Sequence, residues 1–132
     1  MKLESQITSQ DLSERLRDLG VKQLGTFYWR RQGGGPWSIA TAEELAGAAE
    51  FVFAPTVAEL GEMLPSWVSV GLRADQKYRL SIWPEEIGWI TWYGGDRVIL
   101  NKSEADSRAL ALIHLLEKKL ITVEEVNARL SA

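Results

Sequence analysis

Hydrophobic and polar residues alternate from Trp67 to Tyr93, and this pattern predicts three antiparallel strands at about 67–73, 77–83 and 87–93. A turn at 74–76 pairs the first two strands so that one face is apolar, with Val68, Val70, Leu72, Tyr78, Leu80 and Ile82. The other face then receives Trp67, Ser69, Gly71, Arg73, Lys77, Arg79, Ser81 and Trp83. We expect the apolar face to join the core and the basic, aromatic face to lie away from it.

The third strand is harder to orient, because successive side chains point to opposite faces of a sheet. A turn at Pro84-Glu85-Glu86 is favoured, since proline and acidic residues are common in turns. That turn adds Ile87, Trp89, Thr91 and Tyr93 to the basic, aromatic face and leaves Ile90 and Trp92 on the core side. A shift of the turn by one residue reverses this assignment, and both alternatives stay open.

Helix starts recur along the chain as a Thr-x-x-Asp/Glu motif, which is a form of the capping box. The motif begins at Thr8, Thr41, Thr56 and Thr122, and it predicts helices over about 9–19, 42–48, 57–63 and from 122 onward. Ser103 begins the longest helix, at about 104–118. Its apolar stripe is formed by Ala109, Leu112, Ile113 and Leu116.

Shorter apolar runs predict weaker strands near 27–31, 36–40 and 97–100. No alternation of strands with helices of the βαβ kind is visible, so a parallel sheet is not expected. We therefore predict a single α+β domain over residues 1–132. Its meander of three strong strands is extended by one or more weaker strands, and the long helix packs on the apolar face.

Composition narrows the possible chemistry. The 132 residues contain no cysteine, which excludes disulfides, thiolate metal sites and a cysteine nucleophile. No segment has the length and apolar character of a signal peptide or a membrane span, so we expect a cytoplasmic protein. The net charge of −3 makes nucleic acid an unlikely partner for the molecule as a whole. We expect no cofactor, no metal and no membrane contact.

Several short stretches occur together: Phe27-Tyr28-Trp29, Ala54-Pro55-Thr56-Val57-Ala58-Glu59-Leu60 running on to Met63-Leu64-Pro65, Trp92-Tyr93-Gly94-Gly95 and the Ala/Leu-rich segment 109–116. As a set they resemble a loose group of small phage- and prophage-associated bacterial proteins with no assigned activity. The resemblance covers about residues 20–118. The Gly33-Gly34-Gly35 triplet and the last helix depart from the pattern of that group. The resemblance implies an α+β fold and a mobile-element origin, and it supplies no catalytic residues.

Candidate catalytic groups are sparse. His114 is the sole histidine, and its place in line with Ser107, Ala111 and Lys118 predicts an exposed position on the long helix. Paired glutamates at 43–44 and 124–125 fall in first helical turns, where they offset the helix dipole. The glycine triplet at 33–35 lacks the Lys-Ser/Thr of a phosphate-binding P-loop and is read as a hairpin tip. The protein is therefore not expected to be an enzyme.

The basic, aromatic face remains as the candidate site, with partner contacts assigned to Trp67, Arg73, Lys77, Arg79, Trp83 and Trp89. Tryptophan and arginine are enriched at the energetic centres of protein interfaces. The leading hypothesis is thus a protein-interaction or regulatory module that binds another protein or a second copy of itself. The alternative is nucleic-acid binding by the same face together with Arg30 and Arg31, since aromatic and basic side chains stack bases and hold phosphates. A covering layer, either a helix or the 27–40 hairpin, would remove the site.

Overall fold

The computed structural model describes residues 2–47, 50–69, 77–93 and 99–130, and for residues 77, 78 and 93 it describes the backbone alone. The described helices are η1 (Leu3–Ser5), α1 (Gln10–Asp18), η2 (Glu43–Leu45), α2 (Val57–Met63), α3 (Glu104–Glu117) and α4 (Val123–Leu130). The described strands are β1 (Phe27–Arg31), β2 (Ser38–Thr41), β3 (Glu50–Phe53), β4 (Trp67–Ser69), β5 (Lys77–Glu85), β6 (Gly88–Tyr93) and β7 (Ile99–Asn101). The α+β prediction is confirmed.

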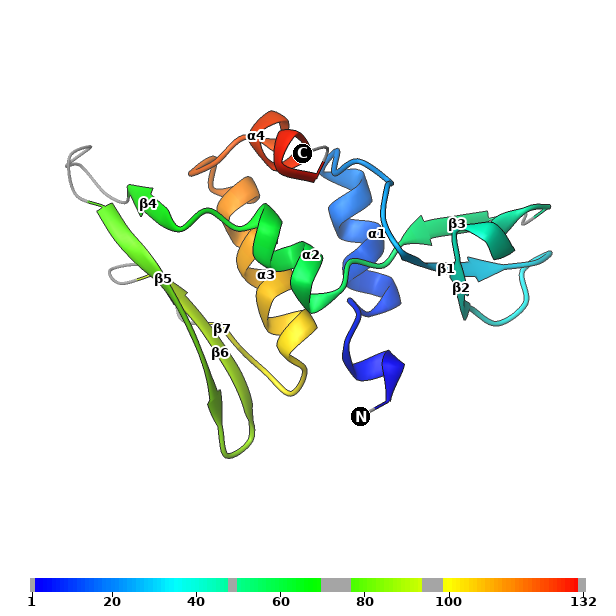
Figure 1. Ribbon diagram of the computed structural model, residues 1–132, viewed down its shortest axis with the longest axis horizontal. Coiled ribbons are helices and arrows are strands. Elements are labelled where there is room, and N and C mark those ends of the chain that lie inside the picture. Colours follow the sequence, from blue (N-terminus) through cyan, green and yellow to red (C-terminus); the bar gives the residue numbers. More distant parts are fainter. Residues whose placement is uncertain (1, 48–49, 70–76, 94–98, 131–132) are drawn as a thin grey trace.

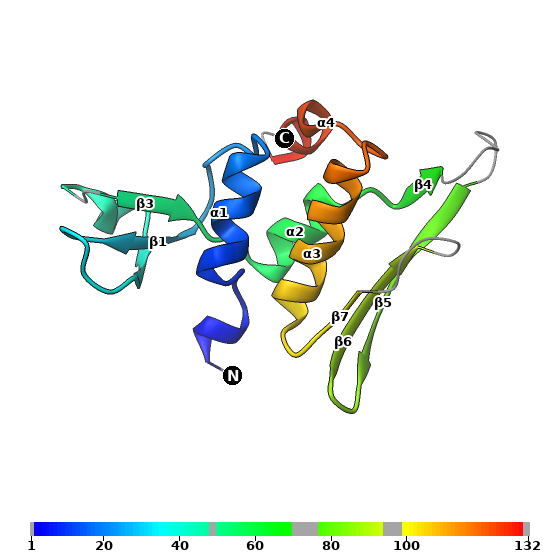
Figure 2. The same cartoon turned by 180° about the vertical axis from the view of Figure 1, so that it is seen from behind.

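These strands form two antiparallel sheets at opposite ends of a layer of helices (Figures 1 and 2). One sheet has the order β2-β1-β3, and the other has the order β4-β5-β6-β7. The prediction that one or more weaker strands extend the meander is confirmed, although the strands near 27–31 and 36–40 do not do so, because they pair with each other and with β3. Only the strand near 97–100 extends it, as β7.

Helix α3 is the centre of the core. It contacts β6 and β7 on one side and α1 and α2 on the other. Its buried side chains therefore spread around the helix instead of following one stripe: Ala105, Ser107, Ala109, Ala111, Leu112, Ile113 and Leu115. The expected exposure of the side that carries His114 is wrong, because Ser107 and Ala111 are buried there and His114 itself is half-buried.

The capping motifs are confirmed in part. Thr56 and Glu59 form a complete capping box at the start of α2, and Ser103 accepts from the backbone N–H of Asp106 at the start of α3. At the fourth motif, the Thr122 hydroxyl accepts from the Glu125 backbone N–H at 3.2 Å.

The threonines of the other two motifs do not take the N-cap position of a helix. Thr8 is buried and its hydroxyl donates to the carbonyl of Pro55 at 2.9 Å, while Ser9 takes the N-cap position of α1. Glu44 accepts from both the backbone N–H and the hydroxyl of Thr41, but a three-residue 3-10 turn replaces the helix expected over 42–48.

The first hairpin of the larger sheet has the predicted facing of side chains. Trp67 pairs with Arg79, Val68 with Tyr78 and Ser69 with Lys77. Val68 is buried and Trp67 is 53% exposed, as expected for the inner and outer faces. Arg73, at the end of the predicted first strand, and the predicted turn at 74–76 lie outside the described residues.

The second hairpin reverses the favoured prediction. Glu85 pairs with Gly88, so the turn consists of Glu86 and Ile87, and the prediction of a turn at Pro84-Glu85-Glu86 is wrong. Pro84 stays within β5, where β4 has already ended, and proline is tolerated on such an edge because no ladder hydrogen bond is lost there. At Gly88 an added Cβ would lie 2.2 Å from the carbonyl oxygen of Asn101, so the turn requires glycine at this position.

The changed register turns Trp89 and Thr91 of β6 toward the inner side of the sheet, in register with Pro84 and Ile82. Thr91 is fully buried, and its hydroxyl lies 2.9 Å from that of Ser107 on α3. Ser107 also donates to the carbonyl of Ile99 at 3.2 Å. A small hydroxyl network therefore joins β6, β7 and α3.

We expect Ser107→Ala to lower the free energy of unfolding by about 1–3 kcal/mol, because it leaves the buried Thr91 hydroxyl without its partner. Thr91→Val keeps the side-chain shape, and the double variant should lose less than the sum of the two single variants. Urea denaturation of the four proteins measures this coupling. Additive losses would show that Thr91 does not face α3 and would contradict the register.

A second polar contact links the starts of α1 and α3. The Asp106 carboxylate accepts from the backbone N–H of Ser9 at 2.8 Å. Burial raises the pKa of Asp106 above its ordinary value of 3.8, and the negative charge of Asp11 adds to the rise, while the hydrogen bonds from Ser9 oppose it. The folded chain therefore keeps the Asp106 proton at a pH where the unfolded chain has lost it.

From this it follows that the free energy of unfolding decreases as the pH rises above about 3.8 through the raised pKa of Asp106. Asp106→Asn keeps an oxygen for the Ser9 N–H but cannot ionise. We expect the stability of this variant relative to the native chain to increase across that pH interval, measured by urea denaturation at a series of pH values. A stability difference that is constant with pH would contradict the assignment.

Candidate functional site

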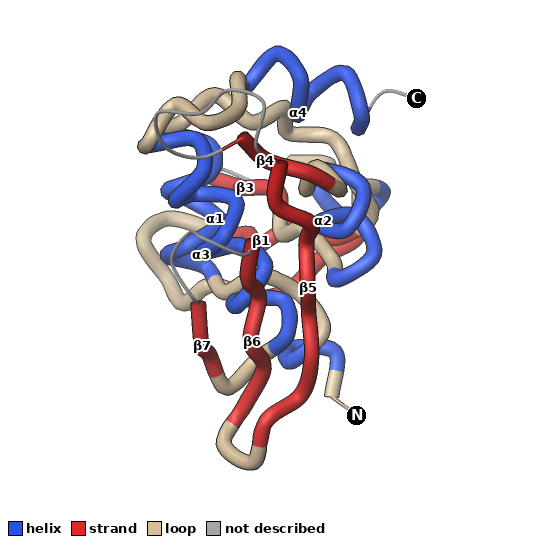
Figure 3. The backbone as a smooth tube through the Cα atoms, turned by 90° about the vertical axis from the view of Figure 1, so that its left-hand side faces the viewer, coloured by secondary structure: helices blue, strands red, loops and turns tan. Residues whose placement is uncertain are grey.

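The side of the β4-β5-β6-β7 sheet that faces away from α3 forms the candidate site, and we call it the outer face. In Figure 1 this sheet lies at one end of the molecule, and Figure 3 views it from that side, with β5, β6 and β7 in front of the helices. None of the described helices or strands lies over it (Figure 3). The strand registers place nine described side chains on this face: Trp67, Ser69, Arg79, Ser81, Trp83, Glu85, Ile90, Trp92 and Leu100.

The centre of the outer face is a pair of tryptophans. The rings of Trp83 and Trp92 pack edge to face, with centroids 6.1 Å apart and an interplanar angle of 78°. Both side chains are half-buried, and so is Ile90, which pairs with Trp83 across the strands. Leu100 continues this apolar surface onto β7 and is 46% exposed.

The two ends of the outer face carry opposite charges. At one end, the guanidinium of the exposed Arg79 lies 5.9 Å from the ring centre of Trp67, which is a cation–π distance. At the other end, the Glu85 carboxylate accepts a hydrogen bond from the Trp83 indole N–H at 2.7 Å. This hydrogen bond keeps the negative charge of Glu85 on the same face as the Trp83–Trp92 pair.

The structure brings together only part of the predicted contact set. Trp67, Arg79 and Trp83 share the outer face. Trp89 does not join them, because the two-residue turn moves it to the inner side, where it lines a recess beside the start of α3 with Val57. Lys77 pairs with Ser69 through the backbone, and its side chain, like all of Arg73, lies outside the described part of the chain.

Sequence reasoning missed four members of the outer face: Glu85, Ile90, Trp92 and Leu100. The signal that would have found them was the alternative turn, which shifts the alternation of β6 by one residue. The correction changes the character of the face. Its middle is aromatic and aliphatic instead of basic, and the described charges sit at its two ends.

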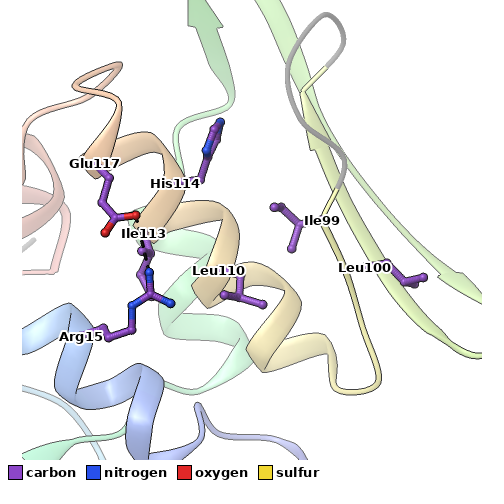
Figure 4. A pocket seen from close by; sticks show the side chains of 7 residues that line it. All are labelled: Arg15, Ile99, Leu100, Leu110, Ile113, His114 and Glu117. Carbon is purple, nitrogen blue, oxygen red and sulfur yellow. Dashed lines mark ion pairs between the residues drawn. The ribbon is translucent and has the colours of Figure 1, made fainter.

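A separate cavity of about 270 Å³ lies between α1, α3 and β7. Arg15 and Glu117 form an ion pair at 3.5 Å on its rim, and both side chains are about half exposed. Figure 4 shows the His114 ring directed away from this pair. His114 and the Glu117 carboxylate therefore do not converge on one point, and the rest of the cavity lining is apolar: Ile99, Leu100, Leu110 and Ile113.

The glycine triplet is a hairpin turn, as predicted. Gly33 and Gly34 have φ of +51° and +79°, the left-handed conformation that glycine adopts without strain. The neighbouring arginines are engaged by the protein itself. Arg31 pairs with Glu50 at 3.0 Å, and Arg30 donates to a backbone carbonyl at 2.6 Å. Both arginines lie in the β2-β1-β3 sheet, at the opposite end of the helix layer from the outer face (Figure 1).

Within residues 2–47, 50–69, 77–93 and 99–130, no three His, Cys, Asp or Glu side chains are grouped so that they could hold a metal ion. The same ranges contain no helix with the length and apolar character needed to cross a membrane. Comparison with known proteins adds nothing further: no family model, curated protein or solved structure matches the chain.

The outer-face tryptophans should contribute less to folding than a tryptophan that joins two elements of the fold. We expect Trp92→Thr to lower the free energy of unfolding by about 0.5–1.5 kcal/mol, the worth of an aromatic pair, because threonine is favoured in strands. Trp29 provides the control, since its indole N–H donates to the Thr8 carbonyl at 2.8 Å and joins β1 to the start of α1. Trp29 is half-buried like Trp92, but Trp29→Ala also removes this hydrogen bond between elements and should cost about 2–4 kcal/mol. Equal losses in urea denaturation would contradict the assignment.

Proposed function

We propose that this protein is a small non-enzymatic interaction or regulatory module that binds another protein surface through its outer face. The observation that supports this most directly is the Trp83–Trp92 pair, set on a sheet face that no described element covers. Contiguous exposed apolar surface of this kind marks interaction sites on folded proteins. The surface extends from Trp83 to Ile90, its partner on β6, and from there to Leu100 on β7.

The energetics favour a contact centred on the two indoles. A tryptophan can bury about 150–250 Å² of surface, and each Å² of apolar area removed from water contributes about 25 cal/mol. Trp83 and Trp92 are already half-buried, so each retains about half of that area for a partner. Together they can provide a few kcal/mol, the scale of an interface hot spot.

The same geometry disfavours the nucleic-acid alternative. That hypothesis requires Arg30 and Arg31 to act with the outer face, but they lie on the other sheet and are engaged there. The Glu85 carboxylate also lies on the outer face and would repel a phosphate backbone. A partner that covers tryptophans and pairs with one charge at each end is better described as a protein.

Three further expectations stay predictions. The phage or prophage origin rests on the sequence resemblance alone, and the genes beside the coding sequence would test it. Location in the cytoplasm rests on the sequence. The absence of catalysis rests on the sequence, in which one histidine and no cysteine leave few candidate catalytic groups.

Substitution of Trp83 or Trp92 by threonine should remove protein binding while the circular dichroism spectrum keeps its native form. We expect at least a tenfold loss of affinity, because hot-spot tryptophans contribute about 2 kcal/mol or more. Affinity capture from the source cells, quantified by mass spectrometry, measures which proteins depend on these two residues.

The matched control is Trp37→Thr. Trp37 is a half-buried tryptophan against Arg31 at 4.7 Å, on the hairpin of the other sheet. It should leave capture unchanged. Capture that is lost equally in all three variants, or retained in all three, would contradict the proposed function.

A further inference from the structure

The distribution of charge and size along β5 points to one particular occupant of the outer face. The side chains on this face follow the order Arg79, Ser81, Trp83, Glu85, so a cation stands at one end, an anion at the other, and a small and a large residue between them. We propose that the outer face binds a second copy of this chain, in a two-fold symmetric dimer whose facing β5 strands run antiparallel. This inference rests on the proposed function and names its partner.

Two-fold symmetry allows two simple ways to stack a sheet on its own copy. An axis along the strands keeps every residue at its own level along the sheet, so Arg79 cannot stand over the partner's Glu85. An axis across the strands, at the level of Ile82, places β5 over the partner's β5 in the opposite direction. Each Arg79 then stands over the partner's Glu85, so a dimer contains two such pairs.

The same axis also places side chains of complementary size opposite each other. Trp83 and Ser81 lie on either side of Ile82, so each Trp83 stands over the partner's Ser81, which leaves room for an indole. On β6, Trp92 pairs with Ser81 and Ile90 pairs with Trp83. Trp92 therefore stands over the partner's Ile90, and large side chains meet small or aliphatic ones across the centre.

The geometry tolerates the usual twist between stacked sheets. Sheets that pack face to face lie about 10 Å apart and cross at about −30°. Arg79 and Glu85 each lie three residues from the axis, which is about 10 Å at 3.3 Å per residue. A 30° crossing displaces the paired charges sideways by about 5 Å, which the flexible arginine side chain can span.

The size of the face sets the expected strength. Four strands about 4.8 Å apart and about 20 Å long give a planar area of a few hundred Å². The accessible surface area is larger than this, because side chains project from the plane. This is below the roughly 800 Å² per partner of a standard interface. We therefore expect a dimer that dissociates in the micromolar range, so the measurement needs protein from about 1 to 500 µM.

Charge exchange between the two ends provides the test. Arg79→Glu alone places two acids opposite each other at each end of the dimer, and Glu85→Arg alone places two arginines there. Each single variant should raise the dimer dissociation constant by about tenfold or more, since two surface ion pairs become two repulsions. The double variant Arg79→Glu/Glu85→Arg should restore it to within about threefold of the native value. Analytical ultracentrifugation measures all four proteins.

Mixing the two single variants gives a sharper result. In the proposed arrangement, the Arg79→Glu chain carries two acids and the Glu85→Arg chain two arginines, so unlike chains attract at both ends while like chains repel. We expect a one-to-one heterodimer when they are mixed, identified by mass after one chain is lengthened with a tag. Charge reversal away from the face, Arg17→Glu with Glu62→Arg, is the control and should leave self-association unchanged.

The outcomes separate this inference from the proposed function. A native chain that stays monomeric at 500 µM overturns the dimer, and so do single variants that self-associate as the native chain does or a mixture that forms no heterodimer. If the chain is monomeric and Trp83→Thr still removes capture of a different protein, the dimer is overturned and the proposed function stands. If Trp83→Thr and Trp92→Thr change neither self-association nor capture, both are overturned.

Discussion

The arrangement of the larger sheet depends on the buried contact between Thr91 and Ser107. Their hydroxyl oxygens are 2.9 Å apart, so β6 and α3 approach closely at this point. Such a separation accommodates a threonine and leaves no room for an indole. Thr91 must therefore face the helix, and because side chains alternate along a strand, Trp92 must face outward. The two-residue turn at Glu86 and Ile87 is the register that satisfies both requirements.

The position of α3 explains why the sheet can leave one face uncovered. This helix already buries side chains against α1 and α2 as well as against β6 and β7. The core is complete on the inner side of the sheet, and the smaller sheet lies beyond α1 at the far end of the helix layer (Figure 2). Neither α3 nor the smaller sheet is therefore available to cover Trp83 and Trp92. An exposed aromatic surface that folding does not consume is available for association.

The sequence alone predicted the elements better than their assembly. Helix starts at Thr56, Ser103 and Thr122 were found because capping is local and depends on side chains within one turn. The inner position of Val68 and the outer position of Trp67 were also found, because that hairpin alternates cleanly. The second hairpin was misplaced because Pro84 is a turn residue by propensity, and its tolerance within β5 depends on where β4 ends, which is a tertiary fact.

Prediction of the candidate site was correct for the first hairpin of the larger sheet and wrong for the second. Trp67, Arg79 and Trp83 were placed together from one strand pair, whereas Trp89 was exchanged for Trp92 through the register of the next pair. The pairing of β1 with β3 was also beyond reach, because strand pairs distant in sequence are decided by burial and not by any local pattern. A shift of one residue thus changed a basic face into an apolar one with charged ends.

The outer face is also prepared for binding before a partner arrives. Trp83 is held by the ring of Trp92 on one side and by the Glu85 carboxylate at its indole N–H. Immobilising a side chain on association costs about 0.5–1.5 kcal/mol, and side chains that are already ordered avoid most of that loss. Strand β6, which carries Trp92, lies between β5 and β7 and contacts α3. Since the area available is small, this preorganisation is what allows two indoles and two charges to support a measurable affinity.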